Sequence, residues 1–280
     1  MLSRGSRGER DGVTALDAVV AFVSRRRWRG AARLRRMLRG HHEVALTRVR
    51  TMDGLLFDLD VENVLDWAVL DHGYYEREVL DAILSRLAHG GVVWDVGANV
   101  GLHAITAKRS RPDATVIAFE PAPHTAARLI ANAELNAAAV RVVTTALSDT
   151  SGVAELSIVT RGNSGLTSLQ PWPDVRYENT ITCPCTRADD LVASGALPAP
   201  TVVKLDVEGF EAEVVRGFGD LLSSSVLSAV IFEAPGASAT CPDDYPVFDL
   251  LTAAGFRIEP LAPAHVAEKA VATNFLATRP

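Results

Sequence analysis

Short apolar stretches alternate with amphipathic ones between residues 92 and 145, and this alternation limits the possible folds more than any other feature of the chain. The apolar stretches suit buried strands, and the segments between them repeat apolar residues at helical spacing. A helix between two strands returns the chain to the edge from which the first strand started, so the strands run parallel. We therefore predict an α/β fold, with a mostly parallel sheet and helices on both faces. The expected elements are strand 92–97, helix 101–109, strand 115–120, helix 123–135 and strand 140–145.

A β-rich insertion is expected to interrupt this alternation. Segments 153–159 and 179–186 alternate apolar and polar residues, which is typical of half-exposed strands, and the Gly, Asn and Pro rich segment 162–175 is expected to be a loop. After the insertion the first pattern returns. We expect strand 201–206, helix 210–222, strand 226–233, helix 245–254, and closing strands near 256–260 and 272–278.

The N-terminal part of the chain is basic, unlike the rest. Residues 1–50 carry 13 Arg against four acids, a net charge of +9 in a chain whose total is -6. Apolar residues recur at helical spacing from 15 to 39, and alternation on both sides of Asp53-Gly54 predicts a β-hairpin. A further helix is expected around 74–91, with Gly90-Gly91 as its end.

This basic segment has two interpretations. Its arginine run, RRRWRGAARLRRMLRG, could bind nucleic acid or an anionic membrane. A solvated helix face or a lid over an active site explains the same residues, and we favour it, so no nucleic acid partner is expected. We interpret residues 1–71 as a lid or an oligomer contact, for example of a homodimer, and residues 72–280 as the main domain.

Cysteine usage and hydropathy predict a cytoplasmic protein without a membrane span. The three cysteines, at 183, 185 and 241, are too few for a disulfide framework, and C-P-C offers at most two metal ligands. The apolar run VTALDAVVAFV contains Asp17 and is shorter than the roughly 20 residues that a membrane helix needs.

A glycine-rich turn predicts a nucleoside site. In VVWDVGANVGLHA, Asp95, Gly97, Asn99 and Gly101 lie where a strand passes into a helix, so that backbone N–H groups can approach a ligand. Glu120 ends the next strand, where a carboxylate can accept hydrogen bonds from ribose hydroxyls. Asp95 would repel the pyrophosphate of a dinucleotide but suits an ammonium and a sulfonium, so the turn favours S-adenosylmethionine over NAD.

These segments together resemble a known family. VVWDVGANVGLHA, AFEPAPHTAARLIANAELN, ALSDTSG, NSGLTSL and KLDVEGFEAEVVRG follow one another in the order and spacing of the FkbM family of S-adenosylmethionine-dependent methyltransferases. The resemblance covers about residues 72–278 and leaves out the basic N-terminal segment. It implies the Rossmann-like class I methyltransferase fold, a seven-stranded sheet in which one strand of the last hairpin is antiparallel.

The resemblance also implies where the cofactor is bound. The glycine turn would surround the methionine part, and Glu120 with Pro121 would lie at the ribose. Leu147, Ser148 and Asp149 of ALSDTSG would lie by the adenine, with Asp149 a candidate acceptor for its amino group. Members of the family mostly methylate hydroxyls of sugars or natural products, so the expected substrate is a small molecule or saccharide with a free hydroxyl.

Acids at the ends of two later strands are candidates for the chemistry. Asp206 ends the strand in VVKLDVEGFEAEVV and is the first choice for the base, or for the acceptor that orients the hydroxyl. Glu208 follows in the turn and is a second candidate, and Glu233 ends the next strand. Acids in the first turn of a helix are stabilised by its dipole, which accounts for Glu211 and Glu213.

Several other roles stay open at the level of sequence. Lys204 should point to the same side of its strand as Asp206, where it could pair with a carboxylate in the crevice or reach the edge of the sheet. Asp206 and Glu233 could hold Mg²⁺, but the spacing does not define a ligand set, so the metal remains unassigned. The histidines that could act as bases are His72, His103, His124 and His265, the last in an expected lid.

The predicted function is O-methyl transfer from S-adenosylmethionine to a small natural product or saccharide. The arginine-rich terminus keeps RNA methylation open as an alternative, although no N-P-P-Y-like motif follows the strand that ends at Asp206. A cofactor-binding scaffold without turnover is a third hypothesis.

Overall fold

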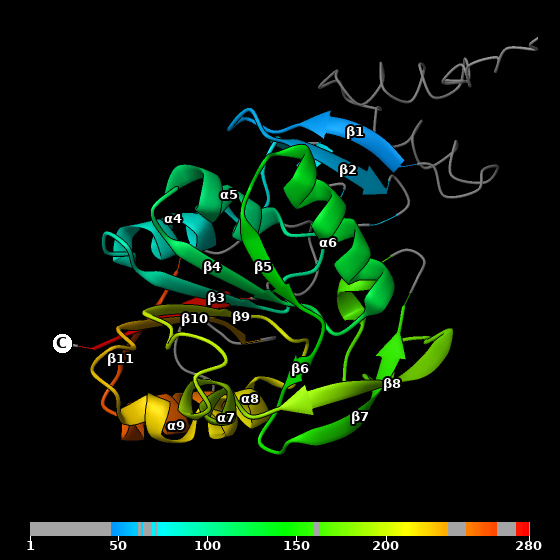
Figure 1. The fold of residues 1–280 in the computed structure, drawn as a ribbon. Helices are drawn as coiled ribbons and strands as arrows, with labels where there is room; N and C mark the ends of the chain where they lie inside the picture. The colour runs from blue at the N-terminus through cyan, green and yellow to red at the C-terminus, as the bar shows by residue number, and fades with distance from the viewer. Residues whose placement is uncertain are drawn as a thin grey trace, which may run out of the picture.

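The computed structural model describes residues 46–60, 63, 66, 69–70, 72–159, 163–234, 245–261 and 273–279 (Figure 1). The helix predicted at 15–39, Cys241 and the lid predicted around His265 lie outside these residues.

Seven strands form the central sheet of the described structure. They are β3 (Val92–Val96), β4 (Thr115–Phe119), β5 (Val140–Val143), β9 (Val202–Leu205), β10 (Ala229–Ala234), β11 (Arg257–Pro260) and β12 (Thr273–Thr278). Their order across the sheet is β11-β12-β10-β9-β3-β4-β5. Neighbouring strands are parallel except at β12, which is antiparallel to both β10 and β11. The mostly parallel seven-stranded sheet of the class I methyltransferase fold is therefore confirmed.

Helices cover both faces of this sheet (Figure 1). One face carries α4 (Arg77–Arg86), α5 (Leu102–Ser110) and α6 (Pro123–Leu135), and the other carries α7 (Ala188–Ala193), α8 (Glu211–Gly217) and α9 (Pro246–Ala253). Trp94 and Ile117 pack toward α8 and α9, whereas the adjacent Val93 and Val116 pack toward α4 and α5. Strands buried on both faces need apolar residues at successive positions, which explains their continuous apolar runs. Within the described ranges, no helix is long and apolar enough to cross a membrane.

Two helix boundaries differ from the prediction. The helix expected to end at Gly90 ends at Arg86, because Leu87 adopts extended backbone and buries its side chain in the core. The helix predicted at 210–222 is divided into α8 and a 3-10 helix (Gly219–Ser223), because Gly219 has a φ of 48°, which an α-helix does not accept. The short helix α7 was not among the predicted elements.

The predicted β-rich insertion is a separate three-stranded sheet. It consists of β6 (Ala146–Leu147), β7 (Gly152–Ile158) and β8 (Asn179–Thr186), in the order β6-β8-β7. Leu156, Ile158 and the free cysteines Cys183 and Cys185 form its core. The loop between β7 and β8 contains a 3-10 turn (Ser164–Leu166) and extends toward the carboxyl edge of the central sheet.

The predicted hairpin is also present. β1 (Leu46–Arg50) and β2 (Leu56–Asp60) pair antiparallel around a turn in which Gly54 has a φ of 81°. The side chains of Asn132 on α6 and of Asn136, which caps this helix, accept hydrogen bonds of 2.8 Å from the backbone N–H groups of Asp58 and Leu56. The hairpin is therefore attached to the main domain through α6 (Figure 1).

Candidate functional site

A cavity of about 440 Å³ opens at the carboxyl ends of β3, β4, β9 and β10. The order of the strands reverses between β3 and β9, and open α/β sheets bind their ligands at such a switch point. The turn after β3, the residues after β4 and the turn after β9 line the cavity, and loop 163–169 of the insertion forms a further wall. Motifs that are separate in the sequence thus lie around one cavity.

The two glycines of the turn after β3 are required by close packing. Gly97 has a φ of 76°, and a Cβ there would lie 1.8 Å from the backbone oxygen of Asp206. Gly101 has a φ of 89°, and its Cβ would lie 2.9 Å from both Ile105 and Leu129. Gly97 therefore lets the turn after β3 contact the turn after β9, while Gly101 lets α5 pack closely on α6.

Asp95 supports this turn from its buried side, away from the cavity. It is 1% exposed, and its Oδ2 accepts a hydrogen bond of 3.0 Å from the N–H of Ala104 in the first turn of α5. Its Oδ1 lies 3.5 Å from Lys204 Nζ. Asp95 is not among the residues that line the cavity. Its contacts therefore favour an indirect role, in which Asp95 fixes the positions of the turn and of Lys204, and these contact the ligand.

Asn99 and Glu120 face the cavity and are bonded to each other. Glu120 accepts hydrogen bonds of 2.9 Å from the N–H groups of Asn99 and Ala122, one on each carboxylate oxygen. Burial raises the pKa of Glu120 to about 7, although these two bonds act in the opposite direction. Asn99 has a φ of 48°, and its Oδ1 is buried without a hydrogen-bond partner. Both side chains therefore present acceptor atoms to a ligand that carries donors.

Lys204 is the buried cation at the centre of the site. Its Nζ donates to the carbonyl oxygen of Gly97 at 2.9 Å and lies 3.1 Å from Asp206 Oδ2. Burial would lower the pKa of Lys204, but the carboxylates of Asp206 and Asp95 outweigh it and raise this pKa. The expectation that Lys204 pairs with a carboxylate is confirmed.

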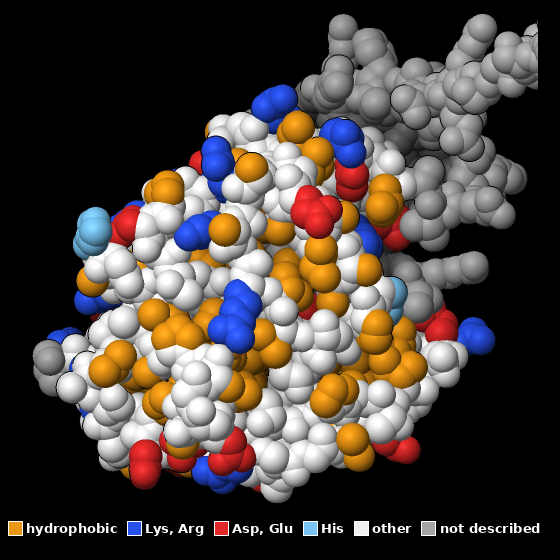
Figure 2. Space-filling view, viewed as in Figure 1, with side chains coloured by type: hydrophobic (Ala, Val, Ile, Leu, Met, Phe, Trp, Pro, Cys, Tyr) orange, Lys and Arg blue, Asp and Glu red, His pale blue; other side chains and the backbone are white. Residues whose placement is uncertain are grey.

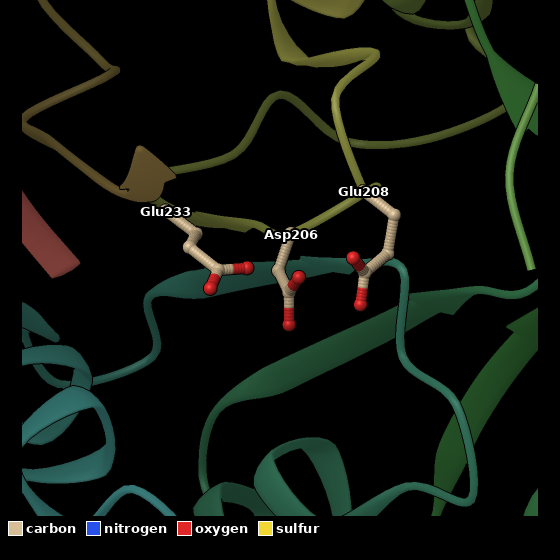
Figure 3. Close-up of side chains that lie close together, drawn as sticks. All are labelled: Asp206, Glu208 and Glu233. Atoms are coloured by element: carbon tan, nitrogen blue, oxygen red, sulfur yellow. The ribbon is translucent and has the colours of Figure 1, made fainter. Parts of the chain in front are cut away.

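Asp206, Glu208 and Glu233 form a cluster of carboxylates in the cavity (Figure 3). Their ligand oxygens lie within 4.8 Å of one another. At that distance two full charges repel by about 3 to 4 kcal/mol in an effective dielectric constant of about 20, so the three do not ionise independently.

Their pKa values separate accordingly. Burial opposes ionisation of Asp206, but Lys204 and the hydrogen bond with Glu233 lower its pKa. Burial and the charges of Asp206 and Glu211 raise the pKa of Glu208 to about 9. Burial and the charges of Asp206 and Glu208 raise the pKa of Glu233 to about 10. Asp206 is therefore the ionised member near pH 7.

Glu211 and Glu213 differ from these three. Glu211 is 0% exposed and accepts hydrogen bonds from the N–H groups of Val207 and Gly209 and from the hydroxyl of Tyr245. It holds the turn after β9 in place and does not line the cavity. Glu213 pairs with Arg216 at 3.0 Å on the surface of α8. Both lie in the first turn of α8, as predicted.

Tyr75 and Glu76, for which no sequence motif predicts a role, also line the cavity. Glu76 precedes α4 with a φ of 42°, accepts a hydrogen bond of 3.2 Å from Asn274, and lies 3.9 Å from His103 Nε2. Burial and the charge of Asp206 raise the pKa of Glu76 to about 7. The only signal in the sequence is that the family resemblance begins at HGYYERE, which does not say where these side chains point.

The predicted adenine and histidine positions are only partly at the cavity. Leu147 lines it, whereas Ser148 and Asp149 do not, so the adenine contact of Asp149 stays a prediction. His103 lines the cavity, and burial followed by the charge of Lys204 lowers its pKa to about 4. His72 and His124 are outside the lining.

The sheet order, the glycine turn and the acids at the carboxyl edge define a class I methyltransferase fold with its ligand site in the usual place. Residues 95–258, more than half of the chain, match the family model of the methyltransferase FkbM domain. The chain therefore belongs to this family.

Curated relatives include methyltransferases of sugars and natural products. The chain is 35% identical over 156 residues to the hexuronic acid methyltransferase AglP of Haloferax volcanii, covering 53% of this chain and 59% of that protein. It is 34% identical over 163 residues to the 31-O-demethyl-FK506 methyltransferase FkbM of Streptomyces tacrolimicus, covering 48% and 62%. The chain thus spans about three fifths of the length of these relatives. A solved structure of a methyltransferase FkbM from Methylobacillus flagellatus aligns with a TM-score of 0.46 at 15% identity, covering 75% of this chain and 53% of that one.

Proposed function

We propose that this chain transfers a methyl group from S-adenosylmethionine to a hydroxyl of a small natural product or a saccharide. Membership of the FkbM family and the two curated relatives support this class of reaction. The observation that carries the proposal is that Glu120 after β4 and Asp206 after β9 open onto one cavity, on either side of the glycine turn. A nucleoside site and a candidate base thus share one space.

The lining residues fit the cofactor. The buried Oδ1 of Asn99 has no partner and can accept from the ammonium of the methionine part. Each oxygen of Glu120 accepts one backbone bond and keeps a second lone pair for a ribose hydroxyl. Pro121 and Leu147 add apolar wall. When bound, S-adenosylmethionine supplies a methyl group on a positively charged sulfur, which the acidic cavity favours.

Asp206 is suited to the acceptor side. The acceptor oxygen must lie close to the methyl carbon and opposite the sulfur, because methyl transfer is an in-line displacement. The new O–C bond forms as the C–S bond breaks, its electron pair stays on sulfur, and the hydroxyl proton passes to the carboxylate of Asp206. A positioned base contributes about 10²- to 10⁴-fold to such a step. Glu208 and Glu233, beside it, can orient the remaining hydroxyls of the acceptor.

We also propose that residues 72–280 form the catalytic domain and that residues 1–71 serve as a lid or an oligomer contact, of which only the described residues, including Asn63 and Asp66, can be compared with the cavity. Asp66 lines the cavity and binds Arg128 on α6 at 2.8 Å. Asn63 donates a hydrogen bond to Ser164 in the wall of the insertion. Both contacts support a lid role for this part of the chain.

Two assays test cofactor binding and methyl transfer separately. Calorimetry should show binding of S-adenosylmethionine, which Glu120→Ala abolishes and Asp206→Asn retains. Labelled methyl transfer to pools of saccharides and natural products should be lost in Asp206→Asn. Binding without transfer to any component of the pools would favour the scaffold hypothesis, and no binding at all would refute the proposal.

A further inference from the structure

Three carboxylates converge on one space in the cavity with a single cationic partner. Figure 3 shows the side chains of Asp206, Glu208 and Glu233 turned toward the same space, and their oxygens lie within 4.8 Å of one another. Among the residues that the structure describes, Lys204 is the one cation that pairs with any of them, through Asp206 Oδ2, and it also pairs with Asp95. Lys204 is therefore already paired with two acids, and Glu208 and Glu233 have no cationic partner beside them in the described part of the chain.

His103 provides a second, independent observation at the same cavity. The residue is 6% exposed and lines the cavity, and its Nε2 has no hydrogen-bond partner. It lies 3.9 Å from Glu76 Oε2 and close enough to Asp206 to be affected by its charge. With the proton on Nδ1, Nε2 offers a lone pair. A buried acceptor without a donor, beside carboxylates, indicates a missing ligand that brings both positive charge and donors.

We propose that Asp206, Glu208 and Glu233 bind a hydrated divalent cation such as Mg²⁺ or Mn²⁺. These are hard cations that prefer carboxylate oxygens and keep several waters. The waters supply the O–H donors that His103 Nε2 and Glu76 can accept, as the outer partners of metal sites commonly do. Asp206 contributes Oδ1, because its Oδ2 already faces Lys204. Binding displaces the protons that the carboxylates otherwise hold.

The site itself does not depend on the proposed methyl transfer, but its use does. Under the proposed function, the cation would acidify an acceptor hydroxyl that replaced one of its waters, and Asp206 would hold that hydroxyl. The cation also allows a negatively charged acceptor to enter a cavity whose acids would otherwise repel it. With the cation bound, the acceptors of the proposed methyl transfer would include the hydroxyls of acidic sugars.

Binding of Mn²⁺ alone tests the site. The full chain is freed of metal with EDTA and titrated with Mn²⁺, without cofactor or acceptor, while the electron paramagnetic resonance signal of free Mn²⁺ is followed. We expect one saturable site per chain with a Kd below about 1 mM, displaced by excess Mg²⁺. Glu233→Gln and Glu208→Gln should each weaken binding at least about tenfold. Glu213→Gln is the matched control, because Glu213 lies on α8 and pairs with Arg216, and it should bind like the unmodified chain.

Two results would overturn the proposal: no saturable Mn²⁺ site below about 1 mM, or equal affinity in the Glu208 and Glu233 variants and the control. Thermal melts followed by circular dichroism show whether each variant is folded, so a lost ligand is distinguished from a lost fold. Mn²⁺ binding without methyl transfer would confirm the metal site and refute the proposed function. Methyl transfer without Mn²⁺ binding would confirm the proposed function and refute the metal site.

Discussion

Replacing Lys204 with methionine tests whether one buried cation holds the centre of the site together. Its Nζ lies 3.1 Å from Asp206 Oδ2 and 3.5 Å from Asp95 Oδ1, and donates to the carbonyl oxygen of Gly97 at 2.9 Å. Methionine fills similar space without charge, so the variant leaves two carboxylates without their cation. Removing one partner of a buried ion pair costs about 3 to 5 kcal/mol, a large part of the roughly 5 to 15 kcal/mol that stabilises a typical domain.

Urea unfolding at pH 7, followed by far-UV circular dichroism, measures this cost. We expect Lys204→Met to lower the free energy of unfolding by about 3 to 5 kcal/mol. Lys108→Met is the control, since Lys108 donates to the carbonyl oxygens of Pro112 and Ala114. Loss of such bonds should cost about 1 kcal/mol.

A double variant shows whether the cost comes from the charge pair. Lys204→Met combined with Asp206→Asn removes one carboxylate along with the cation, so it should be more stable than Lys204→Met alone. If Lys204→Met is no less stable than Lys108→Met, or if the double variant is the least stable of all, the charge-pair reasoning is refuted.

Two further variants and one titration test other parts of the site. Gly97→Ala should weaken S-adenosylmethionine binding more than about tenfold by calorimetry, because its Cβ would lie 1.8 Å from the oxygen of Asp206 and its φ is 76°. Gly54→Ala is the control, at a φ of 81° with open space around it; equal affinities would contradict the packing argument. Glu211→Gln should lower the free energy of unfolding by about 1 to 3 kcal/mol, because three donors lose a charged acceptor; an unchanged urea midpoint would oppose this. Burial raises the pKa of Glu120 to about 7, and the ionised form is the better acceptor for ribose, so affinity for the cofactor should fall as the pH drops below about 7, and a flat profile between pH 6 and 8 would count against that role.

Local patterns were sufficient to predict most elements of the fold. Asp53-Gly54 marked the hairpin, and the alternation of apolar segments marked the strands and helices of the central sheet. The number of strands and the antiparallel strand of the last hairpin came from the family resemblance, because periodicity alone does not say how strands pair. The end of α4 was wrong because Leu87 is buried by tertiary packing, which no local stop signal reports.

The candidate site was predictable where its residues follow strands, and not where they depend on contacts distant in sequence. Asp206 and Glu120 end parallel strands, so they had to meet at one edge of the sheet. Glu76 lies at this edge because its own backbone is left-handed just before α4. Its side chain also accepts a hydrogen bond from Asn274, 198 positions away. The wall from loop 163–169 depends on Ser168, whose hydroxyl donates to the carbonyl oxygen of Glu208 at 2.9 Å. Neither arrangement leaves a periodic signal.

The acids between positions 206 and 213 differ because the backbone passes from a strand through a turn into a helix between them. Asp206 follows the extended β9 and faces Lys204, whereas Glu211 begins α8 and turns its carboxylate onto the turn behind it. Glu208 has a φ of 56°, a left-handed conformation that costs a residue other than glycine about 1 to 2 kcal/mol. Glycine would adopt this backbone without that cost, as Gly209 does next to it at a φ of 97°. A side chain kept in such a conformation and turned toward two other carboxylates is better explained by a ligand at that place than by the stability of the turn.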